Sequence, residues 1–198
     1  TKAIDRAQKR VEAQNFSIRK HLLEYDNVMN SQREIIYDLR TAALQSKNVR
    51  ERLFEMMDAV IDSLLDEFTE QNGHPVDWEM DALAAKYATI FFTHFTLTED
   101  QEIHLVQEAL ADLLKDWTRK AYLQKASVIE PESLAWNERI ILLSTIDDLW
   151  KEHLHEMDHL KEGIGLRGYG QRDPLIEYKR EGYHLFEATL DAINTTTL

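Results

Sequence analysis

Cysteine is absent from this 198-residue chain, and glycine and proline are scarce, with six and three copies. Without cysteine the chain can form neither a disulfide framework nor a thiolate metal site, a composition typical of a reducing compartment. No run of about 18 apolar residues occurs, so we expect no membrane-spanning helix. Neither glycine nor proline interrupts residues 1–72, and such a stretch favours long helices.

Positive charge is also in short supply. The formal net charge is −13, and residues 51–116 hold sixteen acidic against three basic residues. A nucleic-acid binder needs a concentrated basic face to replace the counterions of phosphate. We therefore expect no nucleic-acid partner, and solubility alone accounts for the acidic region.

Helical periodicity runs through the chain, and neither an alternating β pattern nor an internal repeat is present. We therefore predict an all-α fold. The first helix should end near residues 46–48. Thr98 should cap the fourth helix, with Gln101 three residues on, and Asp173 followed by Pro174 should begin the last. The predicted helices span residues 1–45, 48–70, 79–92, 99–125, 132–162 and 174–193.

The first predicted helix is unusually long, roughly 65 Å at 1.5 Å per residue. Its apolar side chains are too many for a rod surrounded by water and too irregularly spaced for a coiled-coil seam. Other parts of a larger protein are expected to pack against it. The chain also opens on Thr1, already inside a helical pattern, so we expect it to be an excised part of a longer one.

Residues 155–159, HEMDH, match the HExxH motif of zinc peptidases. That motif needs both histidines on a helix face that lines a cleft, with the glutamate polarising a metal-bound water. The apolar stripe of this helix contains His153 instead, and at 100° per residue His155 and His159 point about 200° and 240° away from it. We expect both to face solvent and His153 to pack in the core with a hydrogen-bond partner. No metal site and no catalytic residue is predicted, and a zinc metallopeptidase is a disfavoured alternative.

Residues 163–168, GIGLRG, match the GxGxxG pattern of dinucleotide-binding loops. That pattern needs a strand before it and a helix that opens at its third glycine. Here a helix precedes it, and the next helix restarts only at Pro174. No GxxxxGK[ST] phosphate loop occurs either. We predict no cofactor for this chain.

The same glycines suit the tip of an antiparallel helical hairpin, spanning residues 163–174. Gly163 is predicted to take the left-handed conformation that ends the first arm. Ile164 and Leu166 either fold back over the hairpin or, with Tyr169, grip another molecule such as an unfolded polypeptide. The residues expected to pack the second arm against the first are Ile176, Tyr183, Phe186, Leu190 and Ile193.

Two long blocks of the sequence are VEAQNFSIRKHLLEYDNVMNSQREIIY, residues 11–37, and LLSTIDDLWKEHLHEMDHLKEGIGLRGYGQRDPLIEYKREGYHLF, residues 142–186. The first resembles the long scaffold helix, and the second the two-helix finger and tip, of the SecA family, the ATP-driven motors of bacterial protein export. The HExxH histidines depart from the family pattern. The resemblance implies a scaffold helix over 1–47, a helical wing over 48–130, and a scaffold return with the finger over 131–198.

The resemblance implies a mechanical and regulatory role, with no catalytic site in this chain. In the family, motor domains that use ATP and Mg precede this region, and the scaffold helix docks on them; the docking residues implied here are Arg19, Leu22, Leu23, Tyr25 and Asp26. The finger inserts into the SecY channel, contacts the preprotein and restrains ATP turnover. The implied location is cytoplasmic, peripheral at the inner face of the cell membrane. The residues implied to contact polypeptide or channel are Ile164, Leu166, Arg167, Gly168, Tyr169 and Gly170. A stand-alone helical interaction module is the remaining alternative.

Overall fold

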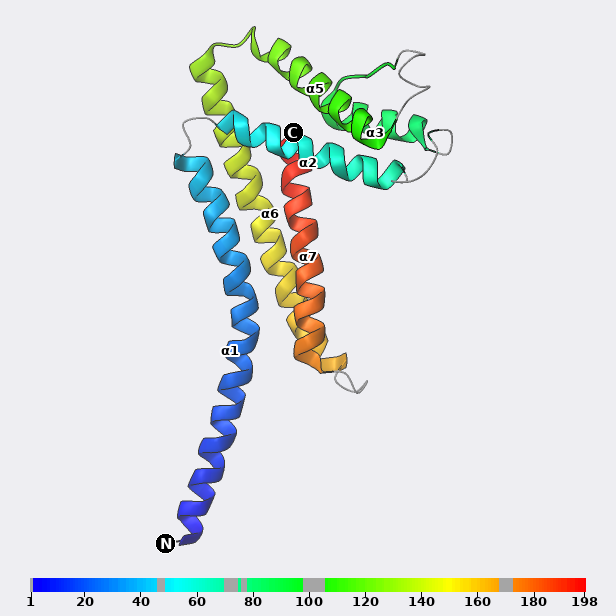
Figure 1. Ribbon diagram of the computed structural model, residues 1–198. Coiled ribbons are helices and arrows are strands. Elements are labelled where there is room, and N and C mark those ends of the chain that lie inside the picture. Colours follow the sequence, from blue (N-terminus) through cyan, green and yellow to red (C-terminus); the bar gives the residue numbers. More distant parts are fainter. Residues whose placement is uncertain (1, 46–48, 70–74, 76–77, 98–105, 168–172) are drawn as a thin grey trace. The chain divides into compact units, whose positions relative to one another are not determined.

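The computed structural model describes residues 2–45, 49–69, 75, 78–97, 106–167 and 173–198. No strand occurs among them, and the regular structure is helical, which confirms the all-α prediction (Figure 1). None of the helices in this part of the chain is both long and apolar enough to cross a membrane. The helices are α1 (Lys2–Gln45), α2 (Val49–Phe68), α3 (Met80–Phe91), α5 (Gln107–Ala126), α6 (Pro131–Arg167) and α7 (Pro174–Thr197).

The bounds of α1, α2 and α3 lie within two residues of the predicted ones. The fourth helix is not continuous from residue 99 to 125 as predicted, because Val106 is extended (φ −121°, ψ 153°) and α5 begins at Gln107. An extended residue is the usual geometry just before a helix, since its carbonyl already accepts the first helical bond. The predicted cap at Thr98 with Gln101, and the break at 46–48, lie outside the described residues.

The chain divides into two compact units. Unit 1 comprises Thr1–Ala42 and Asp147–Thr189, and unit 2 comprises Ala43–Ile146 and Leu190–Leu198. Helices α1, α6 and α7 therefore contribute to both units. The domain bounds suggested by the sequence (1–47, 48–130 and 131–198) remain predictions.

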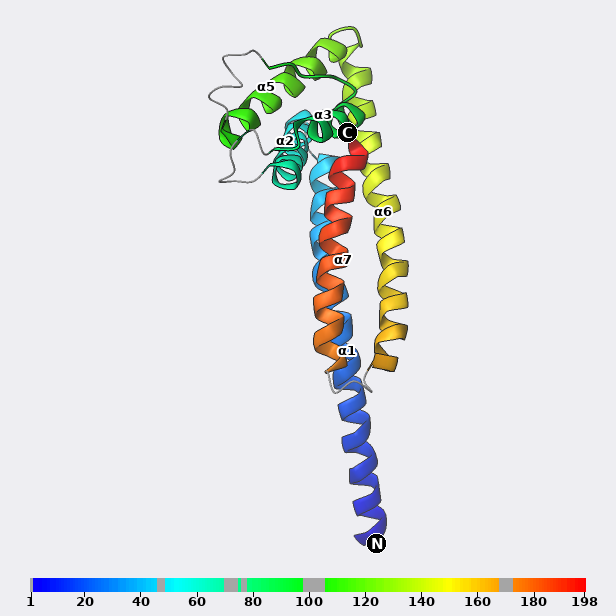
Figure 2. The same cartoon turned by 90° about the vertical axis from the view of Figure 1, so that its right-hand side faces the viewer.

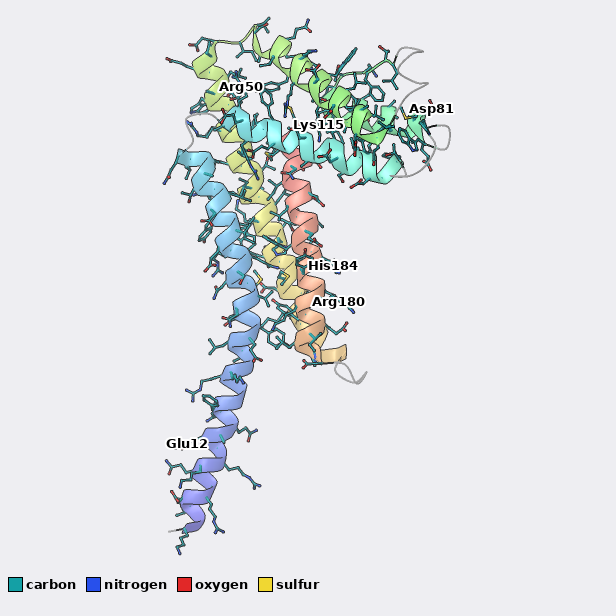
Figure 3. All side chains as sticks on the ribbon, in the orientation of Figure 1. Glu12, Arg50, Asp81, Lys115, Arg180 and His184 are labelled. Carbon is teal, nitrogen blue, oxygen red and sulfur yellow. The ribbon has the colours of Figure 1, made fainter. Side chains whose placement is uncertain are left out.

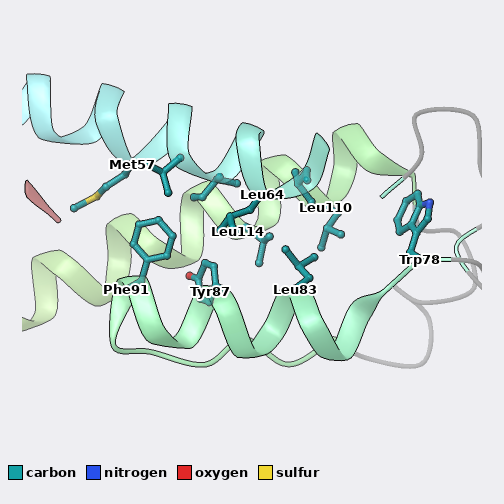
Figure 4. Close-up of a cluster of buried hydrophobic side chains, with 11 residues drawn as sticks. Met57, Leu64, Trp78, Leu83, Tyr87, Phe91, Leu110 and Leu114 are labelled. Atoms are coloured by element: carbon teal, nitrogen blue, oxygen red, sulfur yellow. The ribbon is translucent and has the colours of Figure 1, made fainter. Parts of the chain in front are cut away.

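Unit 2 is built around α2, which packs against α3 and α5. The apolar stripe of α2 is buried from Leu53 to Leu65, and a helix with such a stripe gains most of its stability from this packing. Each aliphatic side chain that is fully buried contributes about 1.5–3 kcal/mol. The cluster consists of Met57, Val60, Ile61, Leu64, Leu65, Trp78, Leu83, Tyr87, Phe91, Leu110 and Leu114 (Figure 4).

A polar network joins α2, α5 and α6 beside this core. Arg50 Nε lies 3.0 Å from Glu138 Oε1, and the Tyr122 hydroxyl donates to the same oxygen. Glu138 is buried, and a buried carboxylate needs such donors to offset its lost hydration. Burial, reinforced by the Glu138 carboxylate, raises the pKa of Tyr122, so the phenol stays a donor.

In unit 1, α1 contacts both α6 and α7. The Tyr25 ring on α1 lies 4.8 Å from the Tyr178 ring on α7, and Arg40 Nε lies 2.9 Å from Asp147 Oδ1 on α6. The helices approach closely at Gly182, where a Cβ would lie 2.7 Å from Met157 Cε. The earlier part of α1 differs: the dark blue segment has neither α6 nor α7 beside it in either view (Figures 1 and 2).

Candidate functional site

The two HExxH histidines lie on the solvent face of α6. Both His155 and His159 are exposed, which confirms the orientation predicted from the helical register. No cluster of three or more His, Asp or Glu side chains that could hold a metal ion occurs in the part of the chain that the structure describes. His155 and His159 therefore have the spacing of a zinc motif, but no third ligand lies beside them among the described residues.

His153 is the histidine that the fold buries, with 1% of its surface exposed. Its Nε2 lies 3.0 Å from Gln32 Oε1 on α1, and its Nδ1 lies 3.1 Å from Thr189 Oγ1 on α7. Gln32 Nε2 in turn donates to the carbonyl of Gly182 at 2.9 Å. The predicted packing role with a hydrogen-bond partner is confirmed, and one imidazole joins all three helices of unit 1.

The partners of His153 determine its tautomer. Gln32 uses its amide hydrogen for the Gly182 carbonyl, so its Oε1 faces the ring and must accept the proton of Nε2. Nδ1 then accepts from the Thr189 hydroxyl. Burial lowers the pKa of His153, because the imidazolium would lose its hydration. The neutral Nε2–H form satisfies these contacts.

Gln32 and Thr189 were not among the residues predicted from the sequence. Both are buried polar residues, and a signal for Gln32 was available: it sits four residues after Val28 and four before Ile36, on the face of α1 that packs. A lone amide inside an apolar stripe usually marks a specific hydrogen bond. Thr189 gives a similar signal within the stripe predicted on α7, since it lies three residues after Phe186 and four before Ile193.

That predicted stripe on α7 is wrong in part. Ile176 and Tyr183 are 63% and 58% exposed, whereas Phe186 and Ile193 are buried as expected. The packed face instead includes small and polar residues that a hydrophobicity pattern overlooks. The buried positions of α7 are Tyr178, Gly182, Phe186, Thr189, Ile193 and Thr197, whereas Arg180 and His184, labelled on α7 in Figure 3, are exposed.

The predicted end of the first finger arm at Gly163 is also wrong. Helix α6 continues through Gly163 to Arg167, and no described glycine has a positive φ. The helix continues because Ile164 packs in a cluster with Met157 and Tyr178 and is only 1% exposed. Of the two readings of Ile164, the structure therefore supports folding back over the hairpin, and this side chain offers no surface to a polypeptide in this conformation.

The rest of the predicted tip is not described. Gly168, Tyr169 and Gly170 lie outside the described residues, as do the side chains of Leu166 and Arg167. The start of the second arm is described. The Asp173 carboxylate accepts the backbone N–H of Leu175 at 2.9 Å, which confirms Asp173 as the predicted cap ahead of Pro174.

The residues expected to dock on motor domains form two groups on α1. Leu22 and Leu23 are 50% and 60% exposed, and Arg19 is exposed as well. The Tyr25 ring instead contacts the Tyr178 ring, tilted by 57°, and Asp26 Oδ1 lies 3.5 Å from Lys161 Nζ on α6. The first part of α1, which has neither α6 nor α7 beside it (Figures 1 and 2), is called the bare part here. Tyr25 and Asp26 therefore lie at the boundary between this bare part and the part that packs on α6 and α7. Glu12, labelled in Figure 3, lies on the bare part.

Comparison with known proteins gives a consistent result. The family model described as the SecA wing and scaffold domain matches residues 1–198. The chain is 42% identical over 198 residues to the protein translocase subunit SecA of Syntrophobacter fumaroxidans, and spans 100% of its own length but 24% of that relative. The SecA subunit of Heliobacterium modesticaldum is 40% identical over 193 residues, covering 98% of this chain and 23% of the relative. That of Koribacter versatilis is 42% identical, covering 100% and 20%. The chain, which spans a quarter or less of these relatives, belongs to the SecA wing and scaffold domain family.

Proposed function

We propose that this chain is the non-catalytic coupling part of a protein-export motor. It would transmit the motion of ATP-hydrolysing motor domains to a preprotein passing through the SecY channel, and restrain ATP turnover between transport events. ATP and Mg would be bound by the motor domains. The chain would act in the cytoplasm, peripherally at the inner face of the cell membrane. Support comes from the family, whose relatives are named protein translocase subunits, and from the solvent-exposed scaffold helix.

The observation that carries this proposal is the exposed apolar surface of α1. Val11, Phe16, Leu22 and Leu23 are 57%, 66%, 50% and 60% exposed. Large apolar side chains exposed on a helix segment that has neither α6 nor α7 beside it (Figures 1 and 2) are expected to be covered by another protein surface. The motor domains of the same polypeptide are the proposed occupant, with Arg19, Leu22 and Leu23 in the contact.

Tyr25 and Asp26 would have a second part in this coupling. Because each also contacts a finger helix, a motor domain that moves against them would act directly on α6 and α7. Tyr169, at the tip between these two helices, is proposed to contact the translocating polypeptide. Leu166, Arg167, Gly168 and Gly170 would shape the tip around it.

The docking proposal can be tested with separately expressed motor domains. The chain should bind them and lower their ATPase rate. Leu22→Asp should weaken the binding by about tenfold or more, because a carboxylate would then be buried against an apolar surface. Leu44→Asp is a matched control, since Leu44 is 49% exposed on the same helix. Equal loss from both variants, or no binding at micromolar concentrations, would contradict docking through Leu22.

The finger proposal requires the full-length translocase. Tyr169→Ala should lower the rate of preprotein transport by about tenfold while leaving basal ATPase within about twofold, because an aromatic contact to the substrate is lost without a change in the motor. Tyr183→Ala removes an aromatic side chain that is 58% exposed on the second finger arm and should leave transport unchanged. If Tyr169→Ala transports at the normal rate, the tip has no such role.

A further inference from the structure

The imidazole of His153 belongs to a continuous chain of hydrogen bonds that joins α1, α6 and α7. The chain runs from the Gly182 carbonyl through Gln32 to His153 Nε2, and from Nδ1 to Thr189. All three side chains are buried, at 6%, 1% and 7% exposure. The ring is therefore shielded from solvent, and a charge placed on it would lose its hydration.

The surroundings of the ring contain no charge to support an imidazolium. It faces the Gln32 amide on α1, the Trp150 ring at 5.4 Å on α6, and the Phe186 ring at 5.5 Å together with the Thr189 hydroxyl on α7. No titratable or charged side chain in the described part of the chain adds to the effect of burial on its pKa. Charging this ring in place would bury an uncompensated cation.

We propose that His153 is a proton-operated latch, which holds α1 against α6 and α7 while it is neutral and releases α1 when it is protonated. The proton comes from solvent and binds Nδ1. Nδ1 then changes from an acceptor to a donor, so the Thr189 hydroxyl must turn away toward the Leu185 carbonyl, 2.8 Å from it. The cation is hydrated only if α1 separates, and the open state therefore takes up a proton that the closed state excludes.

The direction of the pH effect on opening follows from the coupling between proton binding and the open state. The pKa of His153 in the closed state lies below the ordinary value of about 6.5 that the open state has. The closed state is therefore most stable above that value. As pH falls below it, the ratio of open to closed molecules rises by up to tenfold per pH unit, until the lowered pKa is reached.

The absence of cysteine makes the test direct. Spin labels can be attached to the full chain at Ser31→Cys on α1 and His184→Cys on α7, both exposed and both in unit 1. Electron–electron distance measurements should show one short distance at pH 7.5 and a growing longer one toward pH 5.5. An unchanged distance over this range would overturn the proposal.

Substitutions separate a latch from a purely structural contact. His153→Gln cannot titrate, so the distance should no longer depend on pH. Gln32→Glu places a carboxylate beside Nε2, so the His153 NMR titration should move above the ordinary pKa and opening between pH 7.5 and 5.5 should be lost. His155→Gln and His159→Gln, on the exposed face of the same helix, should leave opening as in the parent chain. Persistent pH-dependent opening in His153→Gln, or a normal His153 titration in the parent, would refute the latch.

Discussion

At the scale of single residues, Tyr87 and Thr118 show how a buried polar pair is ordered. Their oxygens lie 2.6 Å apart in the core of unit 2. The Thr118 hydroxyl donates to the Leu114 carbonyl at 2.8 Å, so Tyr87 must be the donor to Thr118. The pair is therefore asymmetric: Tyr87 depends on Thr118, but Thr118 has another partner.

This asymmetry predicts unequal costs of substitution. Thr118→Val should lower the free energy of opening of unit 2 by about 1–3 kcal/mol, because it leaves a buried phenol without an acceptor. Tyr87→Phe should cost less, and the double variant should cost less than the sum of the two. Native-state hydrogen exchange of α3 and α5 amides measures these values. Equal costs for the two single variants would show that Tyr87 is not the dependent partner.

At the scale of elements, the start of α7 depends on one side chain. The Asp173 carboxylate accepts the Leu175 N–H, and its carbonyl accepts from Glu177 at 3.2 Å. Asp173→Ala should therefore destabilise the first turn of α7 by about 1 kcal/mol. Asp173→Asn keeps an acceptor oxygen at the same place, so this variant should destabilise the first turn of α7 much less. Hydrogen exchange of the amides after Pro174 distinguishes the two, and equal exchange in both variants would mean that the carboxylate does not cap the helix.

The helices also show which features of the fold can be predicted from the sequence. The lack of glycine and proline in residues 1–72 predicted α1 and α2, and the apolar stripe of α6 predicted its packed face, including buried His153. The prediction failed where packing overrides local preference. Gly163 looks like a helix end, yet Ile164 gains a buried site by continuing the helix. On α7, Gly182 packs closely against Met157 because it lacks a side chain. A hydrophobicity pattern does not identify a buried glycine of this kind.

The candidate site was predictable to a similar degree. The exposed direction of His155 and His159 followed from helix geometry alone. The partners of His153 did not, because Gln32 and Thr189 lie 121 and 36 residues away from it along the chain. Spacing within one helix carries no information about which side chain of another helix will face it.

At the scale of the whole molecule, charge is distributed unevenly between the two units. Unit 2 contains nine basic and twenty acidic residues, whereas unit 1 contains fourteen basic and sixteen acidic residues. Ion pairs such as Lys115 with Asp62, 2.6 Å apart, offset only part of this excess (Figure 3). A net charge of this size destabilises a folded state through self-repulsion.

Salt should therefore affect the two units differently. Raising sodium chloride from about 0.05 to 0.5 M shortens the Debye length severalfold, so protection of unit 2 amides should rise by about twofold or more. Unit 1, which is close to neutral, should change little. Hydrogen exchange at both salt concentrations provides the comparison within a single sample. A fall in unit 2 protection would mean that its ion pairs outweigh the repulsion.

The bare first part of α1 also has a thermodynamic consequence. With its side chains in water, this segment is held helical by its own backbone bonds and by surface pairs such as Lys9 with Asp5, 3.5 Å apart. A helix sustained in that way is marginal in water. When this segment binds another surface, part of the contact free energy is used to order the helix, and only the remainder contributes to affinity. The measured affinity of the segment should consequently depend on temperature and on its intrinsic helix propensity. A substitution on the helix face away from Arg19 and Leu22, such as Ala13→Gly, would therefore weaken docking by lowering helix propensity, although the exposed Ala13 side chain is outside the proposed contact.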